Sequence, residues 1–170
     1  MRAPRLVWQS RALGLSVLAS VGAVVVALTV QHAFGVRVCP WCVLQRGICL
    51  LMALVAGLGW LLRGVQPMRQ LALALVLVLS LAGLAAAYYQ WDVASQLASC
   101  DLTLADRIIT ALKLESRLPY VFMVTASCAD ADLYHLLGLP YEAWSGLLYL
   151  GLGALSLYTL SRNGHKAHRH

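Results

Sequence analysis

Four apolar stretches of this 170-residue chain are each long enough to cross a lipid bilayer. A helix needs about 20 residues to cross a hydrocarbon core about 30 Å thick. The four stretches cover residues 12–34, 42–62, 71–89 and 143–160. Because 61% of the residues are apolar and only 12% are charged, the composition excludes a soluble globular protein and a disordered chain. The sequence therefore predicts an all-α fold, an integral membrane four-helix bundle formed by residues 1–170 as a single membrane domain.

The first stretch has one alternative interpretation, a cleaved signal peptide. Its apolar region is longer than the core of a signal peptide, and no small-x-small cleavage site follows it. We therefore expect the first stretch to be retained as a membrane span.

The charges predict the orientation of the bundle. The segments before the first stretch, between the second and third, and after the fourth hold eight Lys and Arg residues and no acid. The opposite side, including the start of the second stretch, holds all seven acids and five cations. Because cytoplasmic loops are enriched in Lys and Arg, we expect both termini in the cytoplasm and outer loops at residues 35–41 and 90–142. The net charge of +6 follows from this topology, so no nucleic-acid partner is expected.

Four of the five cysteines fall on the outer side in this topology. Cys39 and Cys42 lie where the short outer loop meets the second stretch, and Cys100 and Cys128 lie in the long outer loop. In a bacterium with a periplasm, that side permits disulfides. Cys49 lies inside the second stretch, where apolar packing is the ordinary role of a cysteine.

The spacing of Cys39 and Cys42 is typical of a redox dithiol or of half a zinc site. Zinc needs two more ligands, and the sequence has no second C-x-x-C and no H-x-x-x-H motif. The histidines of the tail at 164–170 belong to a short basic segment, so no metal site is expected there. A purely structural disulfide is the other alternative, because outer loops of membrane proteins are sometimes stapled in this way.

Local physical chemistry favours redox chemistry at this pair. Pro40 suits the first position of a helix, which makes Cys39 the expected N-cap and places Cys42 in the first turn. Free backbone N–H groups and the helix dipole favour a thiolate there, and Arg46 lies one turn further along the same face. An arginine at the centre of a bilayer costs about 2.5 to 3.5 kcal/mol, which points to a function, with an interfacial anchor as the alternative.

These features together resemble one family. The run from Cys39 to Arg46 (CPWCVLQR), the preceding pair Gln31 and His32, the four stretches and the second cysteine pair are similar to the bacterial disulfide bond formation protein B family. The resemblance covers nearly the whole chain, and it rests on the combination of these motifs.

The resemblance implies an activity, partners and site residues. Its members are multi-pass proteins of the bacterial inner membrane with their active cysteines on the periplasmic side. Cys100 and Cys128 would form a disulfide that a reduced periplasmic thioredoxin-like dithiol oxidase (DsbA-like) attacks at Cys100. Cys128 would then exchange with Cys39, and Cys42 would pass the electrons to ubiquinone or menaquinone of the membrane pool beside Arg46. The chain would thus be a disulfide-generating thiol:quinone oxidoreductase.

Redox potentials set a requirement on such a relay. A structural disulfide has a potential below about −300 mV, whereas the soluble oxidase of such a pathway is near about −120 mV. Oxidising that partner with an ordinary disulfide would be uphill by roughly 8 kcal/mol. Either the disulfides of this chain are unusually oxidising, or quinone reduction drives the sequence, or both.

Some assignments stay open at this stage. Tyr88, Tyr89 and Gln90 stand where the resemblance leads us to expect a histidine, and His32 has no assigned role. The vitamin K epoxide reductase group shares paired cysteines and quinone, but there the quinone-side C-x-x-C is expected near the last span. A small membrane scaffold or metal-binding protein with stapled outer loops is the alternative from another functional class.

The long outer loop contains two expected helices. Thr103 and Asp106 resemble a capping box, and apolar residues recur at helical spacing from Ala105 to Leu112, opposite a polar face that runs on to Arg117. This amphipathic helix is expected either on the outer leaflet or docked on the bundle. A second helix is expected to start at Cys128, next to Ser127 and Asp130, and to stop at Gly138 and Pro140.

Overall fold

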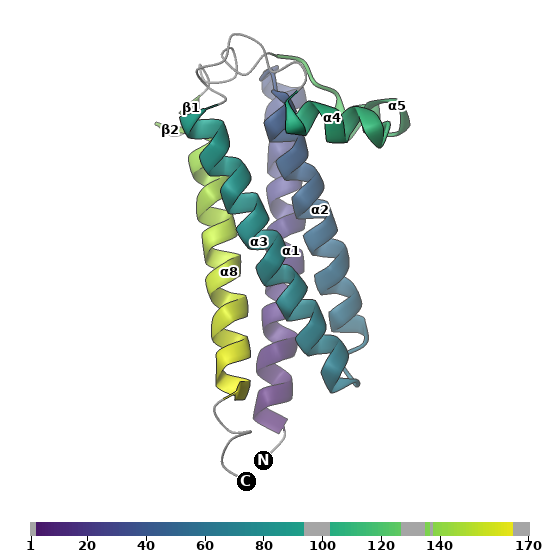
Figure 1. Cartoon of the computed structure of the whole chain (residues 1–170), viewed down its shortest axis with the longest axis vertical. Coiled ribbons are helices and arrows are strands. Elements are labelled where there is room, and N and C mark those ends of the chain that lie inside the picture. The colour runs from purple at the N-terminus through teal and green to yellow at the C-terminus, as the bar shows by residue number, and fades with distance from the viewer. Residues whose placement is uncertain (1–2, 94–102, 127–134, 137, 165–170) are drawn as a thin grey trace.

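The computed structural model describes residues 3–93, 103–126, 135–136 and 138–164. Four long helices run side by side: α1 (Ala3–Phe34), α2 (Pro40–Leu61), α3 (Gln66–Asp92) and α8 (Tyr141–Gly164) (Figure 1). Each contains a segment long and apolar enough to cross a membrane, so the prediction of an all-α membrane four-helix bundle is confirmed. All four helices begin before the predicted stretches, most of all α1, which begins at Ala3 rather than at residue 12, whereas α2 ends at Leu61 rather than at residue 62. Hydropathy marks the apolar segment, and a helix can continue into its polar flanks.

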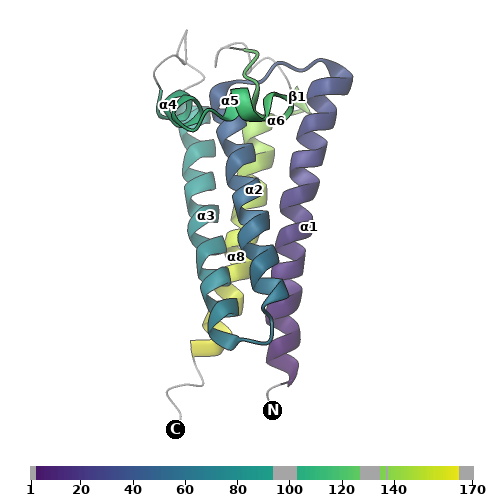
Figure 2. The same ribbon diagram turned by 90° about the vertical axis from the view of Figure 1, so that its right-hand side faces the viewer.

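Helix α1 packs against α2, α2 packs against α3, and α3 packs against α8. The most extensive interface joins α3 to α8, followed by α1 with α2 and α2 with α3. The first turn of α1 and the last turn of α8 lie at the same end of the bundle (Figures 1 and 2). The opposite end carries the N-terminus of α2 and is called the cysteine end below.

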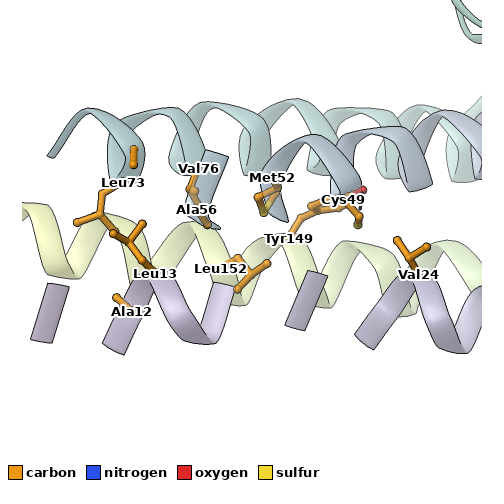
Figure 3. Close-up of a cluster of buried hydrophobic side chains, with 11 residues drawn as sticks. Ala12, Leu13, Val24, Cys49, Met52, Ala56, Leu73, Val76, Tyr149 and Leu152 are labelled. Carbon is orange, nitrogen blue, oxygen red and sulfur yellow. Dashed lines mark hydrogen bonds between the residues drawn. The ribbon is translucent and has the colours of Figure 1, made fainter. Parts of the chain in front are cut away.

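Apolar side chains form a large part of the interior of the bundle. Figure 3 shows one cluster in which Met52, Leu73 and Tyr149 are fully buried between the helices. Outward-facing apolar residues such as Leu18 and Val78 are 71% and 60% exposed. Large exposed apolar surfaces are abnormal in water and ordinary in lipid, so this pattern fits a multi-pass membrane protein.

One glycine allows α3 and α8 to approach closely. A methyl group at Gly83 would overlap the ring of Tyr149, whereas one at Gly22, on the outside of α1, would meet nothing within 4 Å. Small residues commonly permit such close packing between membrane helices. Gly83 therefore determines where the Tyr149 side chain lies.

Three short helices cross the cysteine end (Figure 2): α4 (Leu104–Ala111), α5 (Leu114–Arg117) and α6 (Pro119–Phe122). Thr103 is the N-cap of α4, and its hydroxyl accepts a hydrogen bond from the Asp106 amide at 3.4 Å, as predicted. Ala105 and Ile109 are buried in a cluster with residues of α2, so this face of α4 is docked on the bundle. The expected continuation of the helix to Arg117 is wrong, because Lys113 has a left-handed backbone (φ 50°) that ends it and starts α5.

The last part of the long loop differs from the prediction. Strands β1 (His135–Leu136) and β2 (Leu139–Pro140) pair in an antiparallel hairpin directly before α8. Gly138, at φ 82°, provides the positive φ that such a tight turn needs. The prediction of a helix that continues to Gly138 is therefore wrong for the described residues. The predicted start of that helix at Cys128 lies outside the described residues.

Candidate functional site

The N-terminus of α2 presents two free cysteines to each other. Cys39 is the N-cap, and its sulfur accepts a hydrogen bond from the Cys42 amide at 3.4 Å. Pro40 occupies the first helical position, as the sequence predicted. The Sγ atoms of Cys39 and Cys42 are 3.1 Å apart, in hydrogen-bond contact. A disulfide needs about 2.05 Å between the sulfurs, so only a short movement separates the two thiols from a bond.

The pair is covered by apolar side chains. Cys39 and Cys42 are 0% and 3% exposed. They belong to a cluster that also contains side chains of α2 and the loop before it and of α3, α4 and α6: Val38, Trp41, Val43, Ala86, Ala105, Ile109 and Phe122. The hydrogen bond with Cys42, together with burial, raises the pKa of the Cys39 thiol above its ordinary value. The raised pKa favours the protonated form of Cys39.

Two glutamine side chains connect α3 to the second cysteine. The amide of Gln90 donates a hydrogen bond to the Cys42 sulfur over 3.3 Å, and its carbonyl oxygen accepts one from Gln45 over 2.9 Å. Gln45 and Gln90 are 2% and 5% exposed. The position at which a histidine was expected thus carries a neutral amide in contact with sulfur.

Arg46 lies inside the bundle. It is 2% exposed and donates from Nη1 to the side-chain oxygen of Gln31 and, over 3.2 Å, to the carbonyl of Val121. A longer contact of 3.5 Å reaches the carbonyl of Ala27 on α1. Its Nε has no hydrogen-bond partner among the described residues. An arginine held in this way is not an interfacial anchor, because its charged head is directed into protein.

A cavity of about 500 Å³ lies between α1, α2 and α8. Its walls are largely apolar and include Ala23 and Ala27 of α1 and Leu147 of α8. Gln45 and Arg46 supply polar groups on the α2 side. Binding sites for small molecules typically combine apolar walls with a few placed polar groups, and this volume falls within their usual range of about 300 to 1,000 Å³.

Cys49 is buried, as expected, and it also lines this cavity. Its sulfur is 3.3 Å from the hydroxyl of Tyr149, which donates a hydrogen bond of 2.8 Å to the carbonyl of Gln45. Figure 3 shows the two side chains end to end within the core. Tyr149 thus joins α8 to the turn of α2 that carries the glutamine.

Cys100 and Cys128, the other predicted catalytic residues, lie outside the described residues. The described segment that contains α4, α5 and α6 ends at Ala126, two residues before Cys128. There the amides of Thr125 and Ala126 donate to the carbonyl of Val38 over 3.0 and 3.1 Å, next to Cys39. The Thr125 hydroxyl in turn accepts from the Val38 amide over 2.9 Å.

His32 contacts the same outer segment from α1. Its Nε2 is 3.0 Å from the carbonyl oxygen of Tyr120, and its ring stacks on the Tyr120 ring at 4.3 Å. The contact joins the end of α1 to α6. Among the described residues, no three His, Cys, Asp or Glu side chains form a group that could hold a metal ion.

The sequence singled out Cys39, Cys42 and Arg46 as candidate site residues. It did not predict the contacts of three glutamines. Gln31, Gln45 and Gln90 all lie in or beside apolar stretches, where an uncharged polar group is costly unless it is paired. The cost of an unpaired polar group in an apolar stretch was thus the sequence signal that could have identified these glutamines. Which partners satisfy them depends on how the helices are rotated in the bundle.

Comparisons with known proteins identify relatives of this chain. The family model described as "Disulfide bond formation protein DsbB" matches residues 9–159. A protein of Cupriavidus necator named "Disulfide bond formation protein B" is 36% identical over 150 residues, covering 84% of this chain and 86% of the relative. Relatives of the same name from Polaromonas sp. and Pseudomonas syringae pv. tomato are each 30% identical, over 159 and 155 residues. They cover 89% and 91% of this chain and 90% and 89% of their own length.

Proposed function

The chain belongs to the disulfide bond formation protein B family, and from this premise we propose that it is a thiol:quinone oxidoreductase of the bacterial inner membrane. It would reoxidise a periplasmic thioredoxin-like dithiol oxidase and pass the electrons to ubiquinone or menaquinone, with its cysteines on the periplasmic side and both termini in the cytoplasm. Membership of the family itself shows that the chain is a membrane protein of disulfide bond formation. The finer steps below are our proposal.

The observation that carries the proposal is the cavity whose α2 wall begins one helical turn after Cys42, at Gln45 and Arg46. Arg46 and Gln45 follow Cys42 by one turn of α2, so all three share a helix face. Both line the cavity, and Nε of Arg46 and Oε1 of Gln45 are buried without a partner among the described residues. Buried polar atoms ordinarily have partners, so these two suit the carbonyl of a quinone and the hydroxyl of a quinol.

The proposed reaction at α2 balances two electrons and two protons. The thiols of Cys39 and Cys42 lose two hydrogen equivalents and form one S–S bond, and the quinone substrate gains them and leaves as a quinol. Arg46 orients the acceptor through its free N–H. The apolar walls of α1 and α8 hold the ring and tail of a lipid-soluble substrate.

The proposed path for incoming electrons uses the second cysteine pair. The partner's thiolate attacks a disulfide between Cys100 and Cys128 at Cys100, which releases the Cys128 thiolate. This thiolate attacks the Cys39/Cys42 disulfide at Cys39, which releases the Cys42 thiolate. The partner's second thiol then displaces Cys100, and the partner leaves oxidised. The Cys100 thiolate displaces Cys39 from Cys128, which restores the Cys100–Cys128 disulfide and leaves Cys39 and Cys42 reduced. The hydrogen bonds of Thr125 and Ala126 to Val38 support the exchange between Cys128 and Cys39, because they tie the chain two residues before Cys128 to the residue before Cys39.

A coupled assay tests the proposal. The purified protein in detergent is mixed with a reduced periplasmic thioredoxin-like oxidase and a soluble ubiquinone analogue, and quinone absorbance is followed with time. We expect rapid quinone reduction that Cys42→Ser abolishes and that Cys49→Ala leaves nearly unchanged. Absence of reduction by folded protein with several quinones and partners would refute the proposal and favour a stapled membrane scaffold.

A further inference from the structure

The contact between Gln90 and the Cys42 sulfur has no role in the reaction described so far. Gln90 comes from α3 and is almost fully buried, and it aims its N–H group at the sulfur over 3.3 Å. A buried amide pairs ordinarily with oxygen, because sulfur is a weak acceptor when it is neutral. A hydrogen bond to sulfur becomes strong when the sulfur carries charge.

Gln45 fixes which end of the Gln90 amide faces the sulfur. It donates from Nε2 to the Gln90 carbonyl oxygen over 2.9 Å, so that oxygen is occupied and the Gln90 N–H group is directed to Cys42. The backbone of Gln45 is in turn held by the hydroxyl of Tyr149 over 2.8 Å. Hydrogen bonds that follow one another in a chain also polarise one another. The arrangement is thus a directed donor rather than a chance contact.

The hydrogen bond is present in the reduced pair, whose two sulfurs lie 3.1 Å apart. In the form of that pair that carries one proton, Cys39 is a thiol that donates to a Cys42 thiolate, so Gln90 meets a charged acceptor. When the pair becomes a disulfide, neither sulfur bears a charge, and the acceptor that Gln90 meets is weaker. The bond therefore stabilises the dithiol more than the disulfide. A disulfide whose reduced form is stabilised is a stronger oxidant.

We propose that Gln90 is a positioning residue that raises the reduction potential of the Cys39/Cys42 pair, with Gln45 holding its amide in the orientation required. The inference rests on the proposed function in taking this pair as a redox couple. It addresses the requirement that the relay sets, since a pair with an ordinary structural potential cannot oxidise a strongly oxidising partner. The couple is one S–S bond that takes up two electrons and one proton to give the Cys39 thiol and the Cys42 thiolate.

A redox titration of the full-length protein tests the inference without quinone or partner. The protein in quinone-free detergent is equilibrated anaerobically with mixtures of reduced and oxidised glutathione and is then alkylated. The peptide carrying Cys39 and Cys42 is analysed by mass spectrometry. Gln90→Met keeps the length of the side chain and removes its N–H donor. We expect a tenfold shift of the equilibrium towards the disulfide, which corresponds to a potential about 30 mV more negative.

Two further variants separate this role from a structural one. Gln45→Met leaves Gln90 in place and frees its amide to turn, so we expect a smaller shift in the same direction. Gln9→Met is the matched control, since Gln9 is also a buried glutamine, 3% exposed, that accepts from Arg69 over 2.9 Å. Gln9 lies near the start of α1, at the end of the bundle opposite the cysteine end, so its loss is expected to leave the potential unchanged.

The outcomes are distinguishable. If the wild-type pair does not cycle between dithiol and disulfide, the proposed function fails. If it cycles and Gln90→Met leaves the potential unchanged, or Gln9→Met shifts it equally, the role of Gln90 is refuted. If Gln90→Met does not fold, Gln45→Met decides, and an unchanged potential in that variant overturns the inference.

Discussion

Replacing Arg46 by Lys is the sharpest single test of how the cavity selects its substrate. Lysine keeps the positive charge but carries its donors on one terminal nitrogen, whereas arginine carries separate N–H groups along a planar fork. In the structure the Nη1 group is already engaged by Gln31 and Val121. The lysine ammonium would take over those acceptors, and the free donor at the Nε position would be lost.

The expected magnitude follows from that one donor. A hydrogen bond from a charged group contributes about 1.5 to 3 kcal/mol, and about 1.4 kcal/mol corresponds to a factor of ten in affinity. We therefore expect the KM for a soluble ubiquinone analogue to rise roughly 10- to 100-fold in Arg46→Lys. Because the charge near Cys42 is kept, thiol exchange with the reduced partner should proceed at the wild-type rate.

Steady-state quinone reduction measures the KM, and a single-turnover reaction without quinone measures thiol exchange. Arg63→Lys is the control, since Arg63 lies at the opposite end of α2, where its side chain covers the Trp60 ring at 5.4 Å. An unchanged KM in Arg46→Lys would remove Arg46 from the quinone site. An equal loss of thiol exchange would show that the substitution disturbs the cysteine pair instead.

Three further predictions concern packing, Cys49 and topology. Gly83→Ala should lower the free energy of unfolding by about 1 to 3 kcal/mol, because the added methyl group overlaps Tyr149, whereas Gly22→Ala should not lower it. Thermal unfolding in detergent compares the two variants, and equal midpoints would contradict the close packing. Cys49→Ala should keep more than half of the quinone reductase turnover, and a large loss would give this thiol a part in the reaction. Reporter fusions at residues 62–65 should report a cytoplasmic location, and an external signal there would overturn the topology.

The elements that the sequence predicted correctly depend on neighbours along the chain. The four spans follow from the length of their apolar runs, and the caps at Cys39 and Thr103 follow from residues within one helical turn. The two loop predictions that were wrong concern where short helices stop. There a left-handed Lys113 and a hairpin turn at Gly138 replaced the helix that local signals favoured.

The contacts around Cys42 come from the packing of different helices. The sequence by itself determined that polar side chains stand in the spans or directly beside them, namely Gln31, Gln45, Arg46 and Gln90. Only the tertiary structure decided their pairing, because the rotation of each helix selects which side chains face one another. The apolar sequence is compatible with many such rotations, since lipid and protein interior are alike apolar. Two factors favour one rotation of each helix. They are close packing, as at Gly83 and Tyr149, and the cost of an unpaired polar group in an apolar environment.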